Sequence, residues 1–421
     1  MIDIEIKVNR FGPLNNITLH WAPFMVLTGH SNLGKSYANY LIYYVMSGLL
    51  TDRFDEILKQ KLPEVNDQIE AELTLLEIEK HLNSGVQDYM RSFLGDDFLI
   101  CDVEYKLKSP VEVFHYEIKK TIENDTLPDM PQGIIYSLKF NGELSGFTPK
   151  NFDVAILWFC IKTASVFFES IGDFYRAILL PPGRGAFVGL NYSTRLNTSS
   201  SVGMYDNYFR DYDFSQTTAI SDKIDDEINK LIANFVGGEF LTEKSKQYIL
   251  LSTGEKISLT AAASSIKEIS PLLLCFLNKS GLAFSYCLEE PEAHLHPCSQ
   301  IKIADLIACF LNRGNMFHIT THSDYFLQRI NQLIKLGDIR RLNEETFEKL
   351  CDERGLLKSS YIDRSKVKAY FFHKNAEGKV EVEDMPLTQG GISYKTFYDI
   401  TRDLNEREEY INEQLYKLNE K

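Results

Sequence analysis

The first fifty residues alternate between apolar and polar positions as strands and helices do. Residues 1–8 alternate, which predicts a half-buried strand, and residues 17–21 predict a second strand after a turn at residues 9–13. Residues 24–28 are apolar almost without a break, as in a buried strand, and residues 37–46 suit a helix. The chain therefore begins with three predicted strands followed by a helix.

The next hundred residues change character twice. Residues 55–94 are charged and rich in helix formers, broken at Pro63, which predicts a helical insertion or a short helical pair. Their apolar positions do not sustain heptads, so no coiled-coil arm is expected. Short strand-like runs follow within residues 99–145 and end at the hairpin turn Asn141-Gly142. These runs cover residues 103–107, 111–118 and 134–140.

The middle of the chain is predicted to be helical and then irregular. Residues 154–174 suit a long core helix rather than a membrane span, because Lys162 interrupts an apolar run that is already too short. A strand-like run at residues 177–180 stops at two prolines and a glycine, so Arg184 is presented just past a strand end. Residues 191–220 are rich in polar residues and favour a mobile loop, with an ordinary surface excursion as the alternative.

Strand patterns return in the last third of the chain. Residues 282–289 and 316–319 each predict a buried strand that ends in polar residues. Residues 367–372 and 380–384 are strand-like, and the charged residues 403–421 suit a solvated helix. Alternating strands and helices of this kind predict an α/β fold.

Composition narrows the class of protein. The 421 residues can bury a large core, and we expect one large body with insertions. The net charge of -14 argues against a protein that coats nucleic acid through bulk charge, although a local basic groove stays open. Seven cysteines without a C-x-x-C pair, and an N-terminus unlike a signal peptide, favour a reducing, cytoplasmic location without membrane attachment.

A complete phosphate-loop motif follows the third predicted strand. Residues 29–36 read G-x-x-x-x-G-K-S, in which glycines let backbone N–H groups surround a phosphate. Lys35 would reach the β and γ oxygens of ATP, and the Ser36 hydroxyl would bind Mg²⁺. The alternative is a glycine-rich turn without a ligand. The residues expected to contact nucleotide are Gly29, His30, Ser31, Asn32, Leu33, Gly34, Lys35, Ser36 and Tyr37.

Two adjacent carboxylates end the strand at residues 282–289. Neighbouring strand residues point to opposite sides, so Glu289 and Glu290 can divide two tasks. Glu289 would hold Mg²⁺, directly or through water, and Glu290 would orient and polarise the attacking water. The alternative is an acidic turn that caps the next helix.

Further polar residues lie at two other predicted element ends. His322 follows a strand, where it would hydrogen-bond the γ-phosphate, or serve only as a structural hydrogen-bonding group. Ser264 and Ser265 open an apolar helix and would form an anion site, or an ordinary helix cap. His294, His296 and Cys298 have ligand-like spacing, but no second cluster completes a zinc site.

These motifs in this order resemble the ABC-type ATPases of the branch that contains the SMC and RecF proteins. The resemblance is strongest to the ATPase part of OLD-family and related prokaryotic defence ATPases. Residues 29–36, 289–297 and 320–323 are similar to that group's Walker A, Walker B with D-loop, and switch-histidine motifs. Residues 181–184 are similar to its proline-then-arginine segment, which adds Arg184 to the expected nucleotide contacts.

The resemblance implies a mechanism. In such proteins ATP lies between the phosphate loop of one subunit and the signature serines of another, so nucleotide closes a homodimer or larger homo-oligomer. Here Ser264 and Ser265 would act in trans. Two departures favour slow hydrolysis: no glycine lies near Ser265, and Glu289 stands where many ABC proteins have Asp.

The resemblance also implies a domain organisation. The fold class is α/β, an ABC-type P-loop ATPase head with a mixed sheet, a helical signature lobe and an α+β insertion. The expected segments are an ATPase lobe (1–50), a helical and β insertion (51–150), a helical signature lobe (151–275), a second ATPase lobe (276–345) and a C-terminal hairpin and helix (346–421).

Three functions are compatible with these motifs. The first is an ATPase that controls a separate effector, a nuclease or toxin, in anti-phage defence. The second is a scaffold that closes on ATP with negligible turnover, and the third is a DNA-repair ATPase. Glu381, Glu383 and Asp384 can be imagined as a nuclease metal site, but a solvated strand edge fits them better. Any nuclease is therefore expected to be a separate partner.

Overall fold

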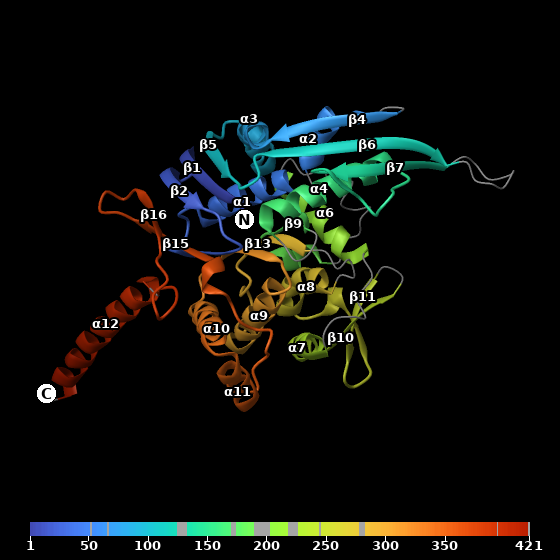
Figure 1. Cartoon of the computed structure of the whole chain (residues 1–421). Helices are drawn as coiled ribbons and strands as arrows, with labels where there is room; N and C mark the ends of the chain where they lie inside the picture. Colours follow the sequence, from blue (N-terminus) through green and yellow to red (C-terminus); the bar gives the residue numbers. More distant parts are fainter. Residues whose placement is uncertain are drawn as a thin grey trace.

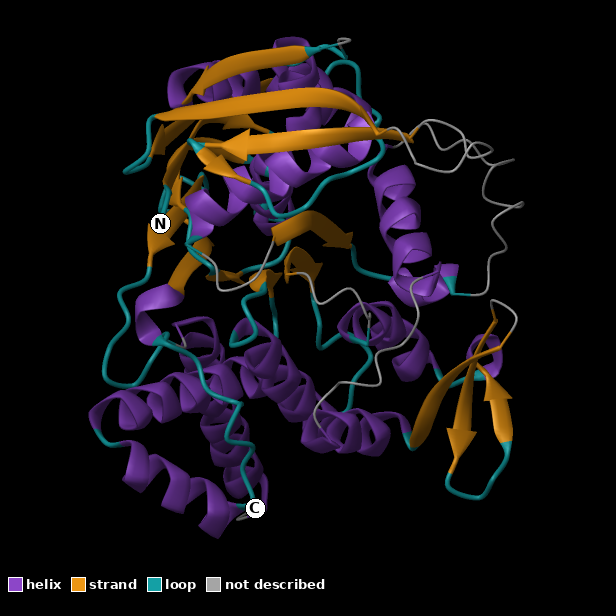
Figure 2. Cartoon of the chain, turned by 45° about the vertical axis from the view of Figure 1, so that its right-hand side comes forward, coloured by secondary structure: helices purple, strands orange, loops and turns teal. Residues whose placement is uncertain are grey.

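A six-stranded sheet forms the centre of the molecule (Figures 1 and 2). The computed structural model describes residues 1–50, 53–64, 67–123, 133–169, 174–188, 203–217, 226–243, 246–277, 283–393 and 395–419. The strand order is β16-β15-β3-β14-β13-β9, in which only β16 runs antiparallel to its neighbour. The strands are β3 (Phe24–Gly29), β9 (Phe174–Leu180), β13 (Ala283–Glu289), β14 (Met316–Thr320), β15 (Val367–Lys374) and β16 (Val380–Asp384).

Both faces of this sheet are covered, which explains why its strands are apolar almost throughout. Successive side chains of a strand point to opposite faces. Along β3, Phe24 and Val26 therefore pack into one hydrophobic core, whereas Met25 and Leu27 pack into the other. Burial on both faces is typical of parallel sheets in α/β proteins.

The first core lies between the central sheet and a layer of antiparallel sheets, shown at the top of Figure 1. Helix α1 (Lys35–Leu49) is buried in this core and contacts β3, β9, β13 and β14. The antiparallel sheets have the orders β2-β1-β5 and β4-β6-β7-β8. Their strands are β1 (Asp3–Phe11), β2 (Leu14–His20), β4 (Gln68–Thr74), β5 (Cys101–Lys108), β6 (Val113–Glu123), β7 (Gly133–Phe140) and β8 (Glu143–Leu144), with helices α2 (Phe54–Lys61), α3 (Leu75–Leu94) and α4 (Phe152–Phe168).

The second core lies on the opposite face and is formed mainly by helices. A small antiparallel sheet, β10-β11-β12, lies beside them, at the lower right of Figure 2. The helices are α6 (Gly203–Thr217), α7 (Asp226–Val236), α8 (Ser264–Phe276), α9 (Pro297–Leu311), α10 (Asp324–Leu342) and α11 (Glu344–Arg354), and the strands are β10 (Gly238–Glu243), β11 (Lys246–Leu251) and β12 (Lys256–Ser258).

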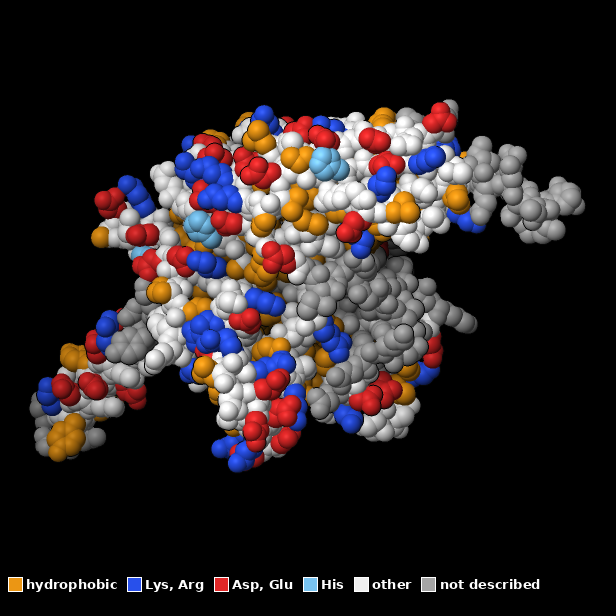
Figure 3. All heavy atoms as spheres, in the orientation of Figure 1, with side chains coloured by type: hydrophobic (Ala, Val, Ile, Leu, Met, Phe, Trp, Pro, Cys, Tyr) orange, Lys and Arg blue, Asp and Glu red, His pale blue; other side chains and the backbone are white. Residues whose placement is uncertain are grey.

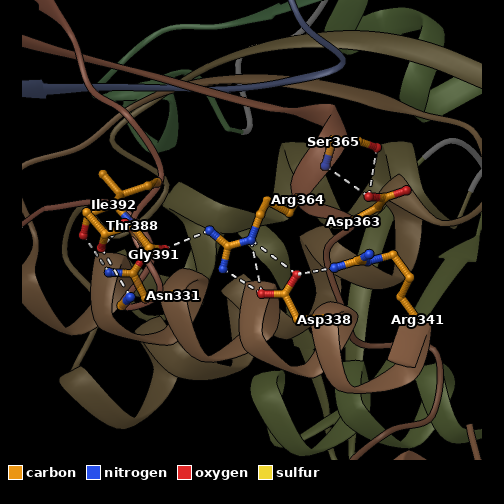
Figure 4. Close-up of polar contacts among 10 residues, drawn as sticks. Asn331, Asp338, Arg341, Asp363, Arg364, Ser365, Thr388, Gly391 and Ile392 are labelled. Carbon is orange, nitrogen blue, oxygen red and sulfur yellow. Dashed lines mark hydrogen bonds and ion pairs between the residues drawn. The ribbon is translucent and has the colours of Figure 1, made fainter. Parts of the chain in front are cut away.

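Polar contacts to α10 fix the C-terminal segment around β15 and β16 (Figure 4). Arg364, just before β15, donates from Nε to Asp338 of α10 at 3.0 Å and from Nη1 to the Thr388 carbonyl oxygen at 2.7 Å. The Asn331 side chain donates to the Ile392 carbonyl oxygen and accepts from its N–H, at 2.8 and 2.7 Å. Gly391 has φ 99°, and a Cβ there would lie 2.2 Å from the Asn331 oxygen, so glycine is required.

Helix α12 (Lys395–Asn419) follows this anchored segment and projects away from the body, at the lower left of Figure 1. Its described side chains are exposed almost all along the helix, apolar Leu404 and Ile411 included. The prediction of a solvated C-terminal helix is therefore confirmed. None of the helices in the described ranges is both long enough and apolar enough to cross a membrane.

The α/β fold and most predicted strands are confirmed, but residues 55–94 are not simply helical. Residues 68–74 form strand β4 between α2 and α3. The Thr74 side chain accepts the Glu77 N–H and the Glu77 carboxylate accepts the Thr74 N–H, so a capping box fixes the start of α3. Ile69, Ala71 and Leu73 alternate with polar residues as in a strand, but the surrounding segment is rich in helix formers, so the sequence analysis did not predict β4.

Two further predictions need correction. The helix predicted at 154–174 ends with α4 at Phe168, and Glu169 adopts the left-handed conformation that terminates it. Part of the loop predicted at 191–220 is helix α6, which buries Tyr208 and Tyr212 one turn apart. Residues 191–202 and 218–220 lie outside the described residues.

Candidate functional site

The phosphate-loop motif connects β3 to α1 at the carboxyl edge of the central sheet. Asn32 and Gly34 both have positive φ, 62° and 93°, so the loop curls back before α1 begins at Lys35. A Cβ at Gly29 would lie 2.1 Å from the Phe372 carbonyl oxygen, which only glycine avoids. The same carbonyl accepts the His30 N–H at 3.0 Å, so β15 supports the loop from one side.

Lys35 lies against this loop. Its Nζ donates to the carbonyl oxygens of Gly29 and His30 at 3.1 and 2.6 Å. Burial lowers the pKa of Lys35 to about 8, and Glu290 and Glu289 oppose that shift. The ammonium is thus held among the loop carbonyls close to two carboxylates, where a phosphate would provide a stronger partner.

Ser36 and Glu289 form a pair suited to a magnesium ion. The Ser36 hydroxyl donates to Oε2 of Glu289 at 2.7 Å, although the two residues are far apart in sequence. Oε1 of Glu289 is buried and accepts no hydrogen bond from the residues that the structure describes. The nearby Tyr40 hydroxyl favours the charged form of the Glu289 carboxylate. Burial raises the pKa of Glu289 to about 7. A hydroxyl and an unsatisfied carboxylate oxygen fit Mg²⁺, which otherwise keeps water and phosphate ligands.

Glu290 turns the opposite way and faces the open side of the site. Its φ of 43° is left-handed, and its N–H donates to the Thr320 carbonyl oxygen at 3.0 Å. One carboxylate oxygen lies 3.9 Å from Nε2 of His322, and both side chains are more than a third exposed. Burial lowers the pKa of His322, Lys35 adds to this, and Glu290 opposes it. The two adjacent acids therefore have different surroundings: Glu289 is buried against Ser36, whereas Glu290 lies in the cleft beside His322.

Glu292 holds the histidine segment in place, a role that the sequence analysis missed. Its Oε1 accepts the Thr321 hydroxyl at 2.7 Å and the His322 N–H at 2.8 Å. The carboxylate is buried, and burial is the main reason that its pKa is raised. The sequence shows that Glu292 lies two residues after Glu290, but it does not show the contact of Glu292 with Thr321 and His322. That contact forms because the paired strands β13 and β14 end side by side.

These segments enclose a polar cleft of about 410 Å³. Pro13 and Thr320 also line it, which the sequence analysis did not foresee. A larger hollow of about 610 Å³ lies over β4, β6 and β7, but three glutamates line it, which disfavours a phosphate. The predicted residues that line the 410 Å³ cleft are Ser31, Asn32, Gly34, Lys35, Ser36, Tyr37, Glu290 and His322.

The remaining loop residues support the cleft without lining it. Leu33 is buried in the first core, and Gly29 ends β3 against β15. The His30 ring is exposed, with its centroid 6.1 Å from that of Phe371. None of these three residues lines the 410 Å³ cleft, and their contact with nucleotide stays a prediction.

Arg184, which the resemblance adds to the expected nucleotide contacts, lies outside the cleft in this structure. The side chain has no exposed surface. Its guanidinium donates to the carbonyl oxygens of Glu268 and Glu289, at 2.8 and 2.7 Å, and of Pro181 at 3.1 Å. Burial lowers its pKa, and nearby Glu268 opposes that shift. A strand-end position alone could not distinguish a buried guanidinium from one facing ligand.

Ser264 and Ser265 also lie apart from the cleft. They form the first turn of α8, where Ser264 is exposed and Ser265 is half-buried. No side chain caps the helix, since Ala263 occupies the N-cap, so the ordinary capping alternative does not apply to these serines. Neither serine lines the chain's own cleft.

The other candidate ligands do not form metal clusters. Glu383 lies 3.0 Å from His373 and Asp384 lies 2.8 Å from Lys368, on edge strand β16. His294, His296 and Cys298 are exposed. Within the described ranges, no group of three or more His, Cys, Asp and Glu side chains is arranged to hold a metal ion.

Comparison with known proteins supports an ATPase. Residues 203–327 match the family model described as AAA ATPase domain, a stretch that contains Ser264, Glu290 and His322. No curated protein matches the sequence.

Three solved SMC heads are similar to this chain over most of their length. The SmcHead bound to the C-winged helix domain of ScpA is 12% identical, with 92% of this chain and 98% of that chain covered and a TM-score of 0.37. The Smc head domain from Pyrococcus furiosus, bound to the C-terminal domain of ScpA, is 10% identical (96% and 100% covered, TM-score 0.36). The SMC head domain from Thermotoga maritima is 10% identical (92% and 100% covered, TM-score 0.35).

The sheet topology, the position of the phosphate loop and the family match define the class. The fold is α/β and consistent with that of a P-loop ATPase. These observations support an ATP-binding ATPase.

Proposed function

We propose that this chain binds ATP with Mg²⁺ in the 410 Å³ cleft and hydrolyses it. The observation that carries the proposal is the convergence of three separate segments at one cleft: the phosphate loop, the acids at the end of β13 and the histidine after β14. Of the two acids, Glu290 lines the cleft and Glu289 is buried against Ser36. Each segment supplies a group that phosphoryl transfer requires.

Each residue of the site has a proposed role in binding or hydrolysing ATP. Backbone N–H groups of residues 30–34 and the Lys35 ammonium bind the phosphates. Mg²⁺ held by Ser36 and Glu289 would neutralise charge on the phosphate oxygens. Glu290 orients the attacking water and accepts its proton, and His322 donates a hydrogen bond to the terminal phosphate.

We further propose that two copies enclose ATP between them. Ser264 and Ser265 support this arrangement because they lie at the N-terminal turn of α8, away from the chain's own cleft. Free backbone N–H groups at such a turn suit a phosphate. The serines of one copy would therefore complete the cleft of the other, giving a two-fold dimer with two ATP molecules.

The dimer would control a separate effector, a nuclease or toxin, as in the defence ATPases that the sequence resembles. Charged side chains of both signs are interspersed on the face shown in Figure 3, and the net charge is -14. This distribution favours a protein partner over bulk nucleic-acid binding. Effector activity in mixtures with the product of the neighbouring gene, with and without ATP, tests this proposal.

A non-hydrolysing scaffold is the second candidate. It is favoured by Ile266, half-buried beside Ser265 where a glycine would allow closer approach to a trans phosphate. Such a scaffold would bind ATP and dimerise without turnover.

Phosphate release separates the two candidates. We expect Mg²⁺-dependent release by the wild-type chain and background release by Glu290→Gln, with the matched control Glu381→Gln, on the exposed edge strand, at the wild-type rate. Equal background rates for wild type and Glu290→Gln would favour the scaffold.

A further inference from the structure

One buried guanidinium connects three segments that meet behind the cleft. Arg184 has no exposed surface, and its N–H groups are directed at carbonyl oxygens rather than at solvent. Nε donates to the Glu268 carbonyl oxygen of α8 at 2.8 Å. Nη1 donates to the Glu289 carbonyl oxygen at 2.7 Å, and Nη2 lies 3.4 Å from that of Glu290. The residue therefore bridges α8 and the backbone of both acids.

The Glu268 side chain completes the connection. One of its oxygens accepts the Gly185 N–H at 2.8 Å, and the other lies 3.7 Å from Nη1 of Arg184. A Cβ at Gly185 would lie 2.8 Å from that carboxylate and 2.9 Å from the Glu268 nitrogen, so the close approach of α8 requires glycine. Two charged side chains that are almost fully buried thus bind α8 to the end of β9.

The position of the Glu290 carboxylate depends on this connection. Glu290 has a left-handed φ of 43°, which a residue other than glycine keeps only when its surroundings hold it. Its N–H is held by Thr320 and its carbonyl oxygen faces Arg184. A displacement of Arg184 would therefore tilt the peptide that carries the proposed catalytic carboxylate.

We propose that Arg184 is a positioning residue that makes the alignment of Glu290 depend on the position of α8. This inference rests on the proposed function, because Ser264 and Ser265, which would contact the opposite ATP, lie one turn before Glu268 on the same helix. Dimer closure would press on the first turn of α8, and the Glu268–Arg184 contact would transmit that movement to the acids. Each cleft would then hydrolyse ATP efficiently only when its own α8 is engaged by the partner's nucleotide.

Arg184→Lys tests the proposal, with Arg176→Lys as the matched control. Lysine keeps the charge but cannot span the carbonyl oxygens of Glu268, Glu289 and Glu290 from one point. Arg176 is also nearly buried on β9 and lies 3.0 Å from Asp211, but it precedes the strand end that carries the site. The Arg176→Lys variant therefore measures how the loss of a buried guanidinium affects the stability of the fold without a change at the site.

For Arg184→Lys we expect the KM for ATP to stay within about threefold of wild type, while kcat falls about ten- to hundredfold. Arg176→Lys should keep both values while losing comparable thermal stability. Glu268→Gln removes the negative charge beside Arg184, so if the two residues act as one connection the double variant should lose no more kcat than the more impaired single variant. Independent structural damage would instead multiply the two losses.

A folded Arg184→Lys with wild-type kcat would overturn the inference, as would multiplicative losses in the double variant. Failure of the proposed function is distinguishable, because it would appear as background phosphate release by the wild-type chain itself. If Arg184→Lys does not fold, the comparison of Glu268→Gln with Arg176→Lys decides: wild-type kcat in Glu268→Gln overturns the proposal, and a tenfold loss supports it.

Discussion

His318 is expected to make the fold sensitive to mild acid. The imidazole lies on β14 with no exposed surface, and its Nε2 accepts the Trp21 indole N–H at 2.8 Å. The Cys287 sulfur also lies near the ring, with Sγ 3.8 Å from Nδ1. Burial lowers the pKa of His318 to about 3, and a backbone contact to Ala22 opposes the shift only in part. The native state therefore holds this histidine neutral.

The sign and size of the effect follow from that pKa. The unfolded chain protonates His318 below its ordinary pKa of about 6.5, whereas the folded chain does so only near 3. Between these values the unfolded state binds more protons, so stability is complete above about pH 6.5 and is lost as the pH falls. Lowering the pH from 7.5 to 5 should cost about 2 kcal/mol through this residue alone.

The test compares His318→Gln with the wild-type chain in urea unfolding followed by tryptophan fluorescence. The glutamine oxygen can still accept the Trp21 N–H but does not titrate. We expect the wild type to lose about 2 kcal/mol more than His318→Gln between pH 7.5 and 5. His115→Gln, on an exposed strand position, should follow the wild type. Parallel curves for wild type and His318→Gln would refute the reasoning.

Three further changes test the site and its support. Lys35→Ala should abolish ATP binding, measured with a fluorescent analogue, and retained affinity would count against the phosphate loop. Glu292→Ala removes the acceptor of the Thr321 hydroxyl and the His322 N–H, so kcat should fall about tenfold or more while ATP still binds; an unchanged kcat would contradict that role. Asn331→Ala removes two hydrogen bonds to the backbone near residue 392, which should cost about 2 kcal/mol and speed hydrogen exchange there. Exchange as slow as in wild type would show that this anchor is unnecessary.

The parts of the site that are local in sequence could be predicted. The phosphate loop needs glycines and a lysine at fixed spacing on one strand-to-helix turn, so residues 29–36 define it by themselves. Glu290 and His322 were predicted because each lies just past the end of an apolar strand, and the carboxyl ends of parallel strands meet at one edge. The structure places both at the same cleft.

The parts that depend on distant packing could not be predicted. Arg184 follows a strand as Glu290 does, but its side chain is buried and donates to the carbonyl oxygens of Glu268 in α8 and of Glu289. The role of Glu292 depends on the residues after β14, which only the pairing of β13 with β14 brings near. Strand β4 was missed because glutamate and glutamine, which favour helices, occupy its solvent-facing positions.

We propose that separate segments of this chain bind one magnesium–ATP, completed by serines from a second copy. Light scattering of Glu290→Gln with ATP and Mg²⁺ tests it most directly, because slowed hydrolysis should trap the closed state. We predict the mass of two chains with ATP and of one chain without it. A variant that binds ATP and stays monomeric would contradict the claim.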